Sequence, residues 1–363
     1  MHIPDGYLSP STCGVLYGAA APFWYVALRR VKTIFRTRVV PLISVFAAFS
    51  FVIMMFNLPI PGGTTAHAVG VGIAAIVLGP WASILAVSIA IFIQALFFGD
   101  GGITTFGANS LNMAIVGSLV AYLVYRALAR RASITASRRV VAAAIAGYVA
   151  INSSALCAAV ELGLQPHFFK DAAGAPLYAP YPLSVAVPAM MIAHLTFAGL
   201  AELVITGGVV AYLQRAEPSL LRFTAPRVPL VDGEGKSAEA DEPRRAWGAV
   251  QSLWIAIALL MVLTPLGILA GGAAWGEWSA HDFSNPVIRE KIAMVSGHVA
   301  PPARAPRGLA RLSSIWSAPF PNYAPRFVRR ASFGYMLSAM FGAGLIILVS
   351  LTLGWFAGKK APS

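Results

Sequence analysis

The chain begins Met1-His2-Ile3-Pro4-Asp5-Gly6-Tyr7-Leu8-Ser9-Pro10, and we expect the rest of it to be organised around this stretch and one distant histidine, His67. A histidine in second position offers a divalent metal the free amine of Met1, the backbone nitrogen of His2 and Nδ1 of its ring. These atoms close two chelate rings in a planar array, which suits Ni(II) or Cu(II). His67 can fill the open fourth corner. The opening residues therefore predict a metal site with Met1, His2 and His67 as ligands.

The alternative is that this histidine lies on a frayed, solvated tail without a function. Three local features argue against such a tail. The bulky His2 disfavours removal of Met1, residues 1–12 contain no lysine or arginine, and apolar residues alternate with turn formers. Ile3-Pro4-Asp5-Gly6 fits a tight turn that would fold the arm back. A secretory signal is disfavoured, because the basic n-region and a small-residue cleavage site are missing.

The composition is that of a polytopic membrane protein. Of 363 residues, 58% are hydrophobic and 11% are charged, and soluble domains of this size do not normally combine these values. The formal charge of +13 could suggest nucleic acid, but the basic residues lie mainly beside apolar runs and not in one patch. We expect no nucleic-acid partner and assign the excess to topology and to contact with anionic membrane lipid. Cys13 and Cys157 lack the spacing of a zinc site.

Nine apolar windows are long enough, or nearly so, to cross a hydrocarbon core of about 30 Å. They cover residues 13–28, 39–57, 66–79, 81–98, 108–127, 139–163, 183–213, 247–270 and 333–357. The third is short, and the seventh is long enough to be tilted or broken. The windows predict an all-α polytopic membrane protein. About seven helices form a substrate-binding core at 1–213, a polar cytoplasmic linker follows at 214–246, and a two-helix unit occupies 247–363.

Clusters of basic residues predict the orientation. Such clusters follow the first window and separate the fifth from the sixth, and both loops should be cytoplasmic. Their members are Arg29, Arg30, Lys32, Arg36, Arg38, Arg126, Arg130, Arg131, Arg138 and Arg139. Counting crossings then places Met1 and the loop before His67 outside and the C-terminus in the cytoplasm. Residues 271–332 become a long extracytoplasmic loop, although its arginines run against the trend, which long loops obey poorly.

The loop 271–332 should be packed on another surface. It contains Trp275, Trp278, Trp316 and Tyr323, which suit an interface, and the proline-rich sequence Ala-Pro-Phe-Pro-Asn-Tyr-Ala-Pro at 318–325. The surface that faces the metal is one candidate. In 58–66, Leu-Pro-Ile-Pro-Gly-Gly-Thr-Thr-Ala, we expect a loop that delivers His67 to the start of a helix, with Thr64 or Thr65 as its cap.

Several polar residues lie in or beside apolar windows, where each is costly unless it is paired or hydrated. Asn109 and Asn112 lie three apart on one helical face, and we expect equally that they join helices or support the ligands. His194 and Glu202 are eight residues apart, and we expect helix–helix hydrogen bonds or contact with a partner subunit. The candidates for support or coupling are therefore Asp5, Asn109, Asn112, His194 and Glu202.

The sequence predicts a transporter subunit and not an enzyme. Gly235-Lys236-Ser237 resembles the end of a phosphate-binding loop, but Leu230 stands where the first glycine is required and no strand precedes it. An intramembrane metalloprotease is disfavoured, because no His-Glu-x-x-His is present. The alternative function is a stand-alone secondary transporter or channel. Its ion path would use Glu161, His194 and Glu202.

Together these motifs resemble the CbiM/NikM family, the substrate-capturing membrane subunits of energy-coupling-factor transporters for cobalt and nickel. The resemblance rests on the opening decapeptide, the His67 loop, Leu78-Gly79-Pro80-Trp81, and the stretches 94–102, 107–113 and 194–202. The tail resembles the auxiliary CbiN/NikN subunit through Leu-Thr-Pro-Leu-Gly at 263–267 and Ala-Trp-Gly-Glu-Trp at 274–278. The characteristic Pro-Asp-Gly-Leu-Glu of that subunit is replaced by Pro-Arg-Gly-Leu-Ala at 306–310.

The resemblance implies an all-helical membrane core with the N-terminal arm inserted from outside. It implies Co²⁺ or Ni²⁺ as the substrate and no cofactor, with the metal held by the Met1 amine, the backbone and ring nitrogens of His2, and His67. It also implies partners: a coupling transmembrane protein like CbiQ/NikQ and two cytoplasmic ATPase subunits like CbiO/NikO.

Overall fold

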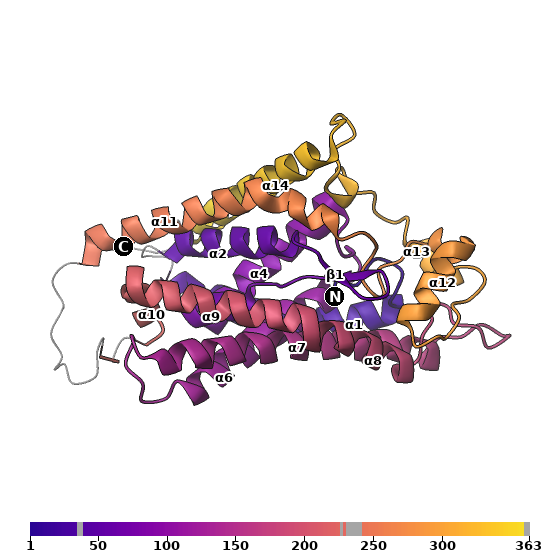
Figure 1. Cartoon of the computed structure of the whole chain (residues 1–363), viewed down its shortest axis with the longest axis horizontal. Helices are drawn as coiled ribbons and strands as arrows, with labels where there is room; N and C mark the ends of the chain where they lie inside the picture. The colour runs from indigo at the N-terminus through magenta and orange to yellow at the C-terminus, as the bar shows by residue number, and fades with distance from the viewer. Residues whose placement is uncertain (35–38, 226–227, 230–241, 359–363) are drawn as a thin grey trace.

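Most of the apolar windows become long helices in the computed structural model, which describes residues 1–34, 39–225, 228–229 and 242–358 (Figure 1). Among these residues, six helices are long and apolar enough to cross a membrane. They are Pro80–Phe98, Phe106–Leu128, Ser137–Phe168, Leu183–Ala216, Gln251–Leu269 and Ala331–Leu353, and Pro41–Met54 is a shorter apolar helix. The prediction of an all-α polytopic membrane protein is confirmed.

The core contains the helices that precede the linker. These are α1 (Pro10–Ile34), α2 (Val39–Met54), α3 (Val71–Leu78), α4 (Pro80–Ile93), α5 (Phe106–Asn109), α6 (Gly117–Leu128), α7 (Ser137–Phe168), α8 (Leu183–Ala193), α9 (Gly199–Ala216) and α10 (Pro218–Arg222). Three of the spans contain a π-helical segment: η1 (Gln94–Phe98), η2 (Ser110–Val116) and η3 (His194–Ala198). The seventh window is therefore one long helix with a local irregularity.

The third window differs from its prediction. Only eight of its residues are helical, as α3 (Val71–Leu78), and this helix is buried along its whole length between Gly70 and Gly79. Both glycines have positive φ values, 72° and 78°, which L-residues with a side chain rarely adopt. The preceding residues form a short antiparallel hairpin of β1 (Leu58–Ile60) and β2 (Thr64–Ala66). Residues 58–79 thus form a hairpin followed by a buried half-helix.

The C-terminal unit has two long helices, α11 (Glu242–Leu263) and α14 (Ala331–Gly358), which both pack on α2. The segment between them contains η4 (Thr264–Leu269), η5 (Asp282–Ser284), α12 (Pro286–Val295), α13 (Arg307–Leu312) and η6 (Pro321–Tyr323). Most of the predicted linker, including Gly235-Lys236-Ser237, lies outside the described residues. Its first residues belong to α9 and α10, so the helical core continues beyond residue 213.

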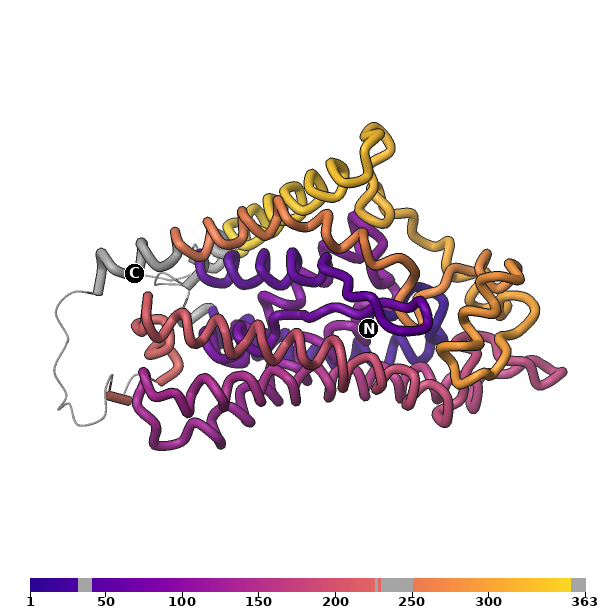
Figure 2. The backbone as a smooth tube through the Cα atoms, viewed as in Figure 1, coloured from indigo at the N-terminus to yellow at the C-terminus, as the bar shows by residue number. Residues whose placement is uncertain are grey.

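The two ends of the molecule are formed by different helices. Figure 1 shows α12 and α13 at one end and α10 at the other, and the backbone tube in Figure 2 follows the same arrangement.

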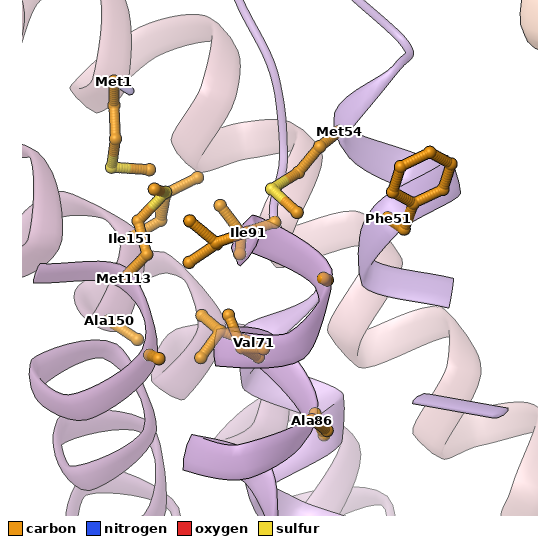
Figure 3. Close-up of a cluster of buried hydrophobic side chains, with 14 of the residues drawn as sticks. Met1, Phe51, Met54, Val71, Ala86, Ile91, Met113, Ala150 and Ile151 are labelled. Atoms are coloured by element: carbon orange, nitrogen blue, oxygen red, sulfur yellow. The ribbon is translucent and has the colours of Figure 1, made fainter. Parts of the chain in front are cut away.

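Met1 lies within the bundle, in a cluster of buried apolar side chains that includes Met113 and Ile151 (Figure 3). The first residue of the chain is therefore part of the core.

Candidate metal centre

The N-terminal arm is folded back by a tight turn. Gly6 has φ 89° and lies under α13, where a Cβ atom would come within 2.8 Å of the Leu309 carbonyl oxygen. The Tyr7 N–H closes the turn by donating to the Pro4 carbonyl oxygen at 3.4 Å, and the Tyr7 hydroxyl donates to the Trp278 carbonyl oxygen at 2.7 Å. The turn predicted from Ile3-Pro4-Asp5-Gly6 is thus present, and the C-terminal unit covers it.

Two of the candidate support residues hold this arm. The Asp5 carboxylate accepts hydrogen bonds from the backbone of Ile103 at 3.1 Å and of Thr104 at 2.7 Å. The Asn109 side chain bonds to both backbone groups of Ile3: its Oδ1 accepts from the N–H at 2.8 Å, and its Nδ2 donates to the carbonyl oxygen at 3.0 Å. The arm is therefore fixed to the segment that joins the fourth and fifth windows.

His67 approaches the arm from the β1–β2 hairpin. Thr64 donates to the Ala273 carbonyl oxygen at 2.8 Å and lies within β2, so the expectation that Thr64 or Thr65 caps a helix is wrong. The His67 ring is buried, and its Nδ1 donates to the Ala68 carbonyl oxygen at 3.0 Å. Burial, reinforced by the nearby Met1 amine and His2, lowers the pKa of His67 well below its ordinary value. A neutral ring with Nδ1 as the donor leaves the Nε2 lone pair available.

Glu202 positions the segment that follows His67. Its carboxylate accepts from the N–H groups of Val69 and Gly70, both at 2.8 Å, and of Gly72 at 3.1 Å. These are the free donors at the start of α3, where a negative charge is favourable. Glu202 is fully buried, so it acts as a helix cap supplied by α9. It forms the interhelical contact that was expected of it.

The predicted ligands meet at this point. The His2 and His67 rings lie 5.0 Å apart between centroids, and both side chains are buried. The Met1 amine lies 3.1 Å from Oε1 of Glu277, and Nδ1 of His2 lies 2.5 Å from Oδ1 of Asp100. Nε2 of His2 is buried and has no hydrogen-bond partner among the described residues. Residues separated by more than sixty positions thus form one cluster.

A cavity of about 760 Å³ adjoins this cluster, between the core and the C-terminal unit. His67, Asp100 and Glu277 all line it. The Met1 amine and Nδ1 of His2 are therefore paired with carboxylates that line the same cavity. A divalent cation in this space would be close to nitrogen donors and to two negative charges.

Asp100 connects the cluster to the C-terminal unit. The Tyr323 hydroxyl donates to Oδ2 of Asp100 at 2.6 Å and accepts from Gln94 at 2.9 Å. Burial alone would raise the pKa of Asp100, but the charge and hydrogen bond of His2, with His67 and Tyr323, hold it below its ordinary value. The pKa of Tyr323 is raised well above its ordinary value by burial and by the Asp100 charge. Asp100 is therefore an ionised group with a fixed orientation.

The other candidate residues do not reach the cluster through their hydrogen bonds. Asn112 donates to Glu161 at 2.8 Å, within the pair of helices that contains η2 and α7. His194 bonds through Nδ1 to the Met190 carbonyl oxygen of its own helix at 2.8 Å. Although Asn109 and Asn112 are three residues apart, they serve different partners. Among the described residues, His194 makes no interhelical hydrogen bond, and its contact with a partner subunit stays a prediction.

Sequence reasoning did not single out three residues of the cluster as functional: Asp100, Glu277 and Tyr323. Asp100 has a local signal, because it is enclosed by Gly99, Gly101 and Gly102. Gly102 allows a close approach, since a Cβ atom there would lie 2.3 Å from Oδ1 of Asp5. Glu277 lies in the Ala-Trp-Gly-Glu-Trp motif and Tyr323 in the loop that we expected to pack on another surface, but neither segment indicates its partner, which is more than 200 positions away.

The changed motif Pro-Arg-Gly-Leu-Ala at 306–310 packs on the core through its two unchanged central residues. The N–H groups of Gly308 and Leu309 both donate to the Leu177 carbonyl oxygen, at 2.8 and 3.2 Å. A Cβ atom at Gly308 would come within 2.4 Å of the Tyr178 ring. Gly308 and Leu309 thus keep this segment in contact with the core.

Side chains alone do not supply a metal site here. Among the described residues, no three His, Cys, Asp or Glu side chains form a group able to hold a metal ion. A site at His2 and His67 would therefore need further donors, and the predicted chelate would supply them from the Met1 amine and the His2 backbone nitrogen.

Comparison with known proteins identifies the family. Residues 2–220 match the cobalt uptake substrate-specific transmembrane region, CbiM, and residues 250–359 match the PDGLE domain. The fused nickel transport protein NikMN of Rhodobacter capsulatus is 55% identical over 99% of this chain and 98% of its own length. The probable fused nickel transport protein LarMN of Lactiplantibacillus plantarum is 41% identical over 96% of both chains.

Solved structures agree with this result. A crystal structure of a transition metal transporter has a TM-score of 0.57 and 52% identity, and it covers 62% of this chain and 99% of that one. The structure of a truncated transition metal transporter has a TM-score of 0.55 and 54% identity, and the match covers 59% of this chain and 98% of that one. The chain belongs to the CbiM family of cobalt and nickel transport proteins, and its CbiM region is fused to a PDGLE domain like that of CbiN.

Proposed function

We propose that this chain captures Ni²⁺ or Co²⁺ at the outer face of the cell membrane for an ATP-driven energy-coupling-factor importer. The observation that carries this proposal is the meeting of the Met1 amine, His2 and His67 beside one cavity. The N-terminus would be extracytoplasmic and the C-terminus cytoplasmic. In support, the Met1 amine pairs with Glu277 of the 271–332 segment, and α10, a described part of the predicted cytoplasmic linker, lies at the end opposite to α12 and α13 (Figure 1).

The ligands are the Met1 amine, the backbone nitrogen and Nδ1 of His2, and the free Nε2 of His67. In the described arrangement, the amine and Nδ1 direct protons toward Glu277 and Asp100. A bound cation replaces those protons and therefore lies close to the carboxylates of Glu277 and Asp100. Their charges then offset that of the substrate, which lowers the cost of burying it.

We favour nickel over cobalt as the substrate. A planar set of nitrogen donors suits Ni²⁺, and Co²⁺ would need a modified geometry. Two relatives that match the whole chain are named as nickel transport proteins. Titration of the purified protein with each ion under anaerobic conditions tests this preference, and tighter binding of Co²⁺ would reverse it.

The His67→Ala variant should lose about 100-fold or more in Ni²⁺ affinity, because the change removes a ligand, whereas changes outside the ligand shell cost roughly 10- to 100-fold. Expression and folding should remain, since His67 makes one hydrogen bond, to the neighbouring Ala68. Isothermal titration of the purified chain measures the affinity. His281→Ala is the control, because His281 is exposed in the outer segment, and it should bind as the wild type does. Equal affinities of the two variants would contradict the assignment.

Tyr323→Phe should lower Ni²⁺ affinity by roughly tenfold, because Asp100 loses the hydroxyl that fixes its second oxygen. Tyr335→Phe is the matched control. Tyr335 also lines the cavity, but its hydroxyl donates to the Met55 carbonyl oxygen at 2.9 Å. The same titration compares the two variants. If both lost affinity equally, the contact of Tyr323 with Asp100 would have no specific role.

The proposed partners are a coupling transmembrane protein and two cytoplasmic ATPase subunits, like CbiQ/NikQ and CbiO/NikO, and the chain itself is not an enzyme. A stand-alone secondary transporter with an ion path through Glu161, His194 and Glu202 is the alternative. Glu161 bonds to Asn112, His194 to the Met190 carbonyl oxygen, and Glu202 to the start of α3. Because these partners are separate, the three residues do not form one path, which favours structural roles. Nickel uptake by this chain alone in vesicles without ATP would support the alternative.

A further inference from the structure

A second cavity, of about 350 Å³, lies at the end of the molecule that is opposite to α12 and α13. Among the described residues, it is lined by the last turns of α6, by residues 129–131, by Arg139 of α7 and by Thr224, Ala225 and Val228. Its charged lining residues are all arginines, namely Arg126, Arg130, Arg131 and Arg139, and Tyr122 and Tyr125 line it as well. The cavity is therefore strongly positive.

The loop that carries Arg130 and Arg131 is held by side chains of the neighbouring helices. Arg139 is buried, and its Nε donates to the carbonyl oxygens of Ala132 at 3.1 Å and Ser133 at 2.8 Å. Its Nη1 donates to the Tyr125 hydroxyl at 2.9 Å. From α9, Gln214 donates to two further carbonyl oxygens of the loop, those of Ile134 and Ala136, at 2.7 and 2.9 Å. The cavity is thus built by side chains from three helices.

The arginines lack anionic partners in the part of the chain that the structure describes. The ion pairs found there, Met1–Glu277 and His2–Asp100, belong to the metal centre at the other end. Arg131 also has φ 65°, a conformation that residues with a side chain rarely adopt and that tends to occur at binding sites. Since arginine is always charged in proteins, the cavity is suited to bind an anion.

The position of the cavity in the fold favours a lipid. The apolar span that contains α6 ends at Leu128 and the apolar span of α7 begins at Ser137, so residues 129–131 directly follow the end of a span. Leu123 and Val141, on the same two helices, have exposed apolar side chains that acyl chains would cover. A free anion would not use this neighbouring apolar surface.

We propose that this arginine cavity binds the phosphate of an anionic lipid headgroup, such as that of phosphatidylglycerol. The planar guanidinium groups match phosphate oxygens in charge and geometry. The volume falls within the range of about 300–1,000 Å³ that small-molecule sites occupy. Basic pockets between membrane helices are known to hold anionic headgroups. This site is separate from the proposed metal centre, and its test does not depend on metal transport.

The test compares lipid binding by the full chain and by a triple variant, Arg126→Gln, Arg130→Gln and Arg131→Gln. These three side chains are exposed, so the variant should fold, whereas Arg139 is needed to hold the loop. Native mass spectrometry from micelles with added phosphatidylglycerol or phosphatidylcholine measures retention. The wild type should prefer phosphatidylglycerol, and the triple variant should lose its affinity for this lipid by about tenfold or more.

The control triple variant is Arg29→Gln, Arg215→Gln and Arg222→Gln, which changes the net charge equally but leaves the lining of the cavity intact. It should retain phosphatidylglycerol to within about twofold. Equal loss in both triples, or no preference of the wild type for the anionic lipid, would overturn the proposal. So would full competition by millimolar inorganic phosphate, which would identify a free anion. If the cavity variant kept its lipid but lost a protein partner, the arginines would serve that partner instead.

Discussion

One alanine added ahead of Met1 is expected to abolish tight binding of Ni²⁺. The amine would move one residue away from His2, so the chelate formed by the amine, the backbone nitrogen and the His2 ring could not close. The loss should exceed the roughly 100-fold upper range for changes outside the ligand shell. The fold leaves no room for the addition, because Met1 is buried and its amine is 3.1 Å from Glu277.

Titration of the purified, extended protein measures this effect, and mass spectrometry shows that the added residue is retained. One alanine added after Ser363 is the matched control, since it lengthens the chain equally without touching the arm. Thermal denaturation in detergent separates lost binding from lost folding. Wild-type affinity in the N-terminally extended protein would refute the chelate, whatever the behaviour of His67→Ala.

Glu202→Gln is expected to reduce both stability and metal affinity. The carboxylate of Glu202 accepts three backbone hydrogen bonds at the start of α3, and an amide can replace only part of this set because its nitrogen is a donor. Hydrogen bonds to a charged group contribute about 1.5–3 kcal/mol each, and a buried unpaired N–H costs about 1–3 kcal/mol. We expect a loss of about 3–5 kcal/mol in stability. His67 lies only two residues before Val69, so the ligand should move with this segment.

Glu161→Gln gives a matched comparison, because Glu161 is also a mostly buried carboxylate within a span, but its partner is Asn112. An amide oxygen at position 161 can still accept from Asn112, so this variant should bind Ni²⁺ nearly as the wild type does. Thermal denaturation and titration of both purified variants report the two effects. If Glu161→Gln weakened binding as much as Glu202→Gln, the cap on α3 would have no special link to the metal centre.

The sequence was sufficient for the features that depend on local pattern. Apolar windows located the long helices, and Ile3-Pro4-Asp5-Gly6 indicated the turn. The pairing of the first two residues with His67 followed from nitrogen chemistry and from counting spans. The structure places the His2 and His67 rings 5.0 Å apart, so these residues are close enough to act together.

Features that depend on contacts between distant segments were beyond the sequence. Periodicity cannot show that Glu277 meets the Met1 amine or that Tyr323 orients Asp100, because nothing local in either segment refers to the other. Thr64 and Thr65 looked like helix caps, but hairpin pairing with 58–60 took precedence over their local preference. The true cap, Glu202, comes from α9, which only tertiary packing could reveal.

Glu277 and Tyr323 reach the proposed metal centre from a unit that is covalently joined to the core. A tethered unit meets its partner at an effective concentration in the millimolar range, so dilution in the membrane does not separate the two. Each translated copy of the core therefore carries its own Glu277 and Tyr323, and unequal synthesis of two separate genes cannot leave a core without them.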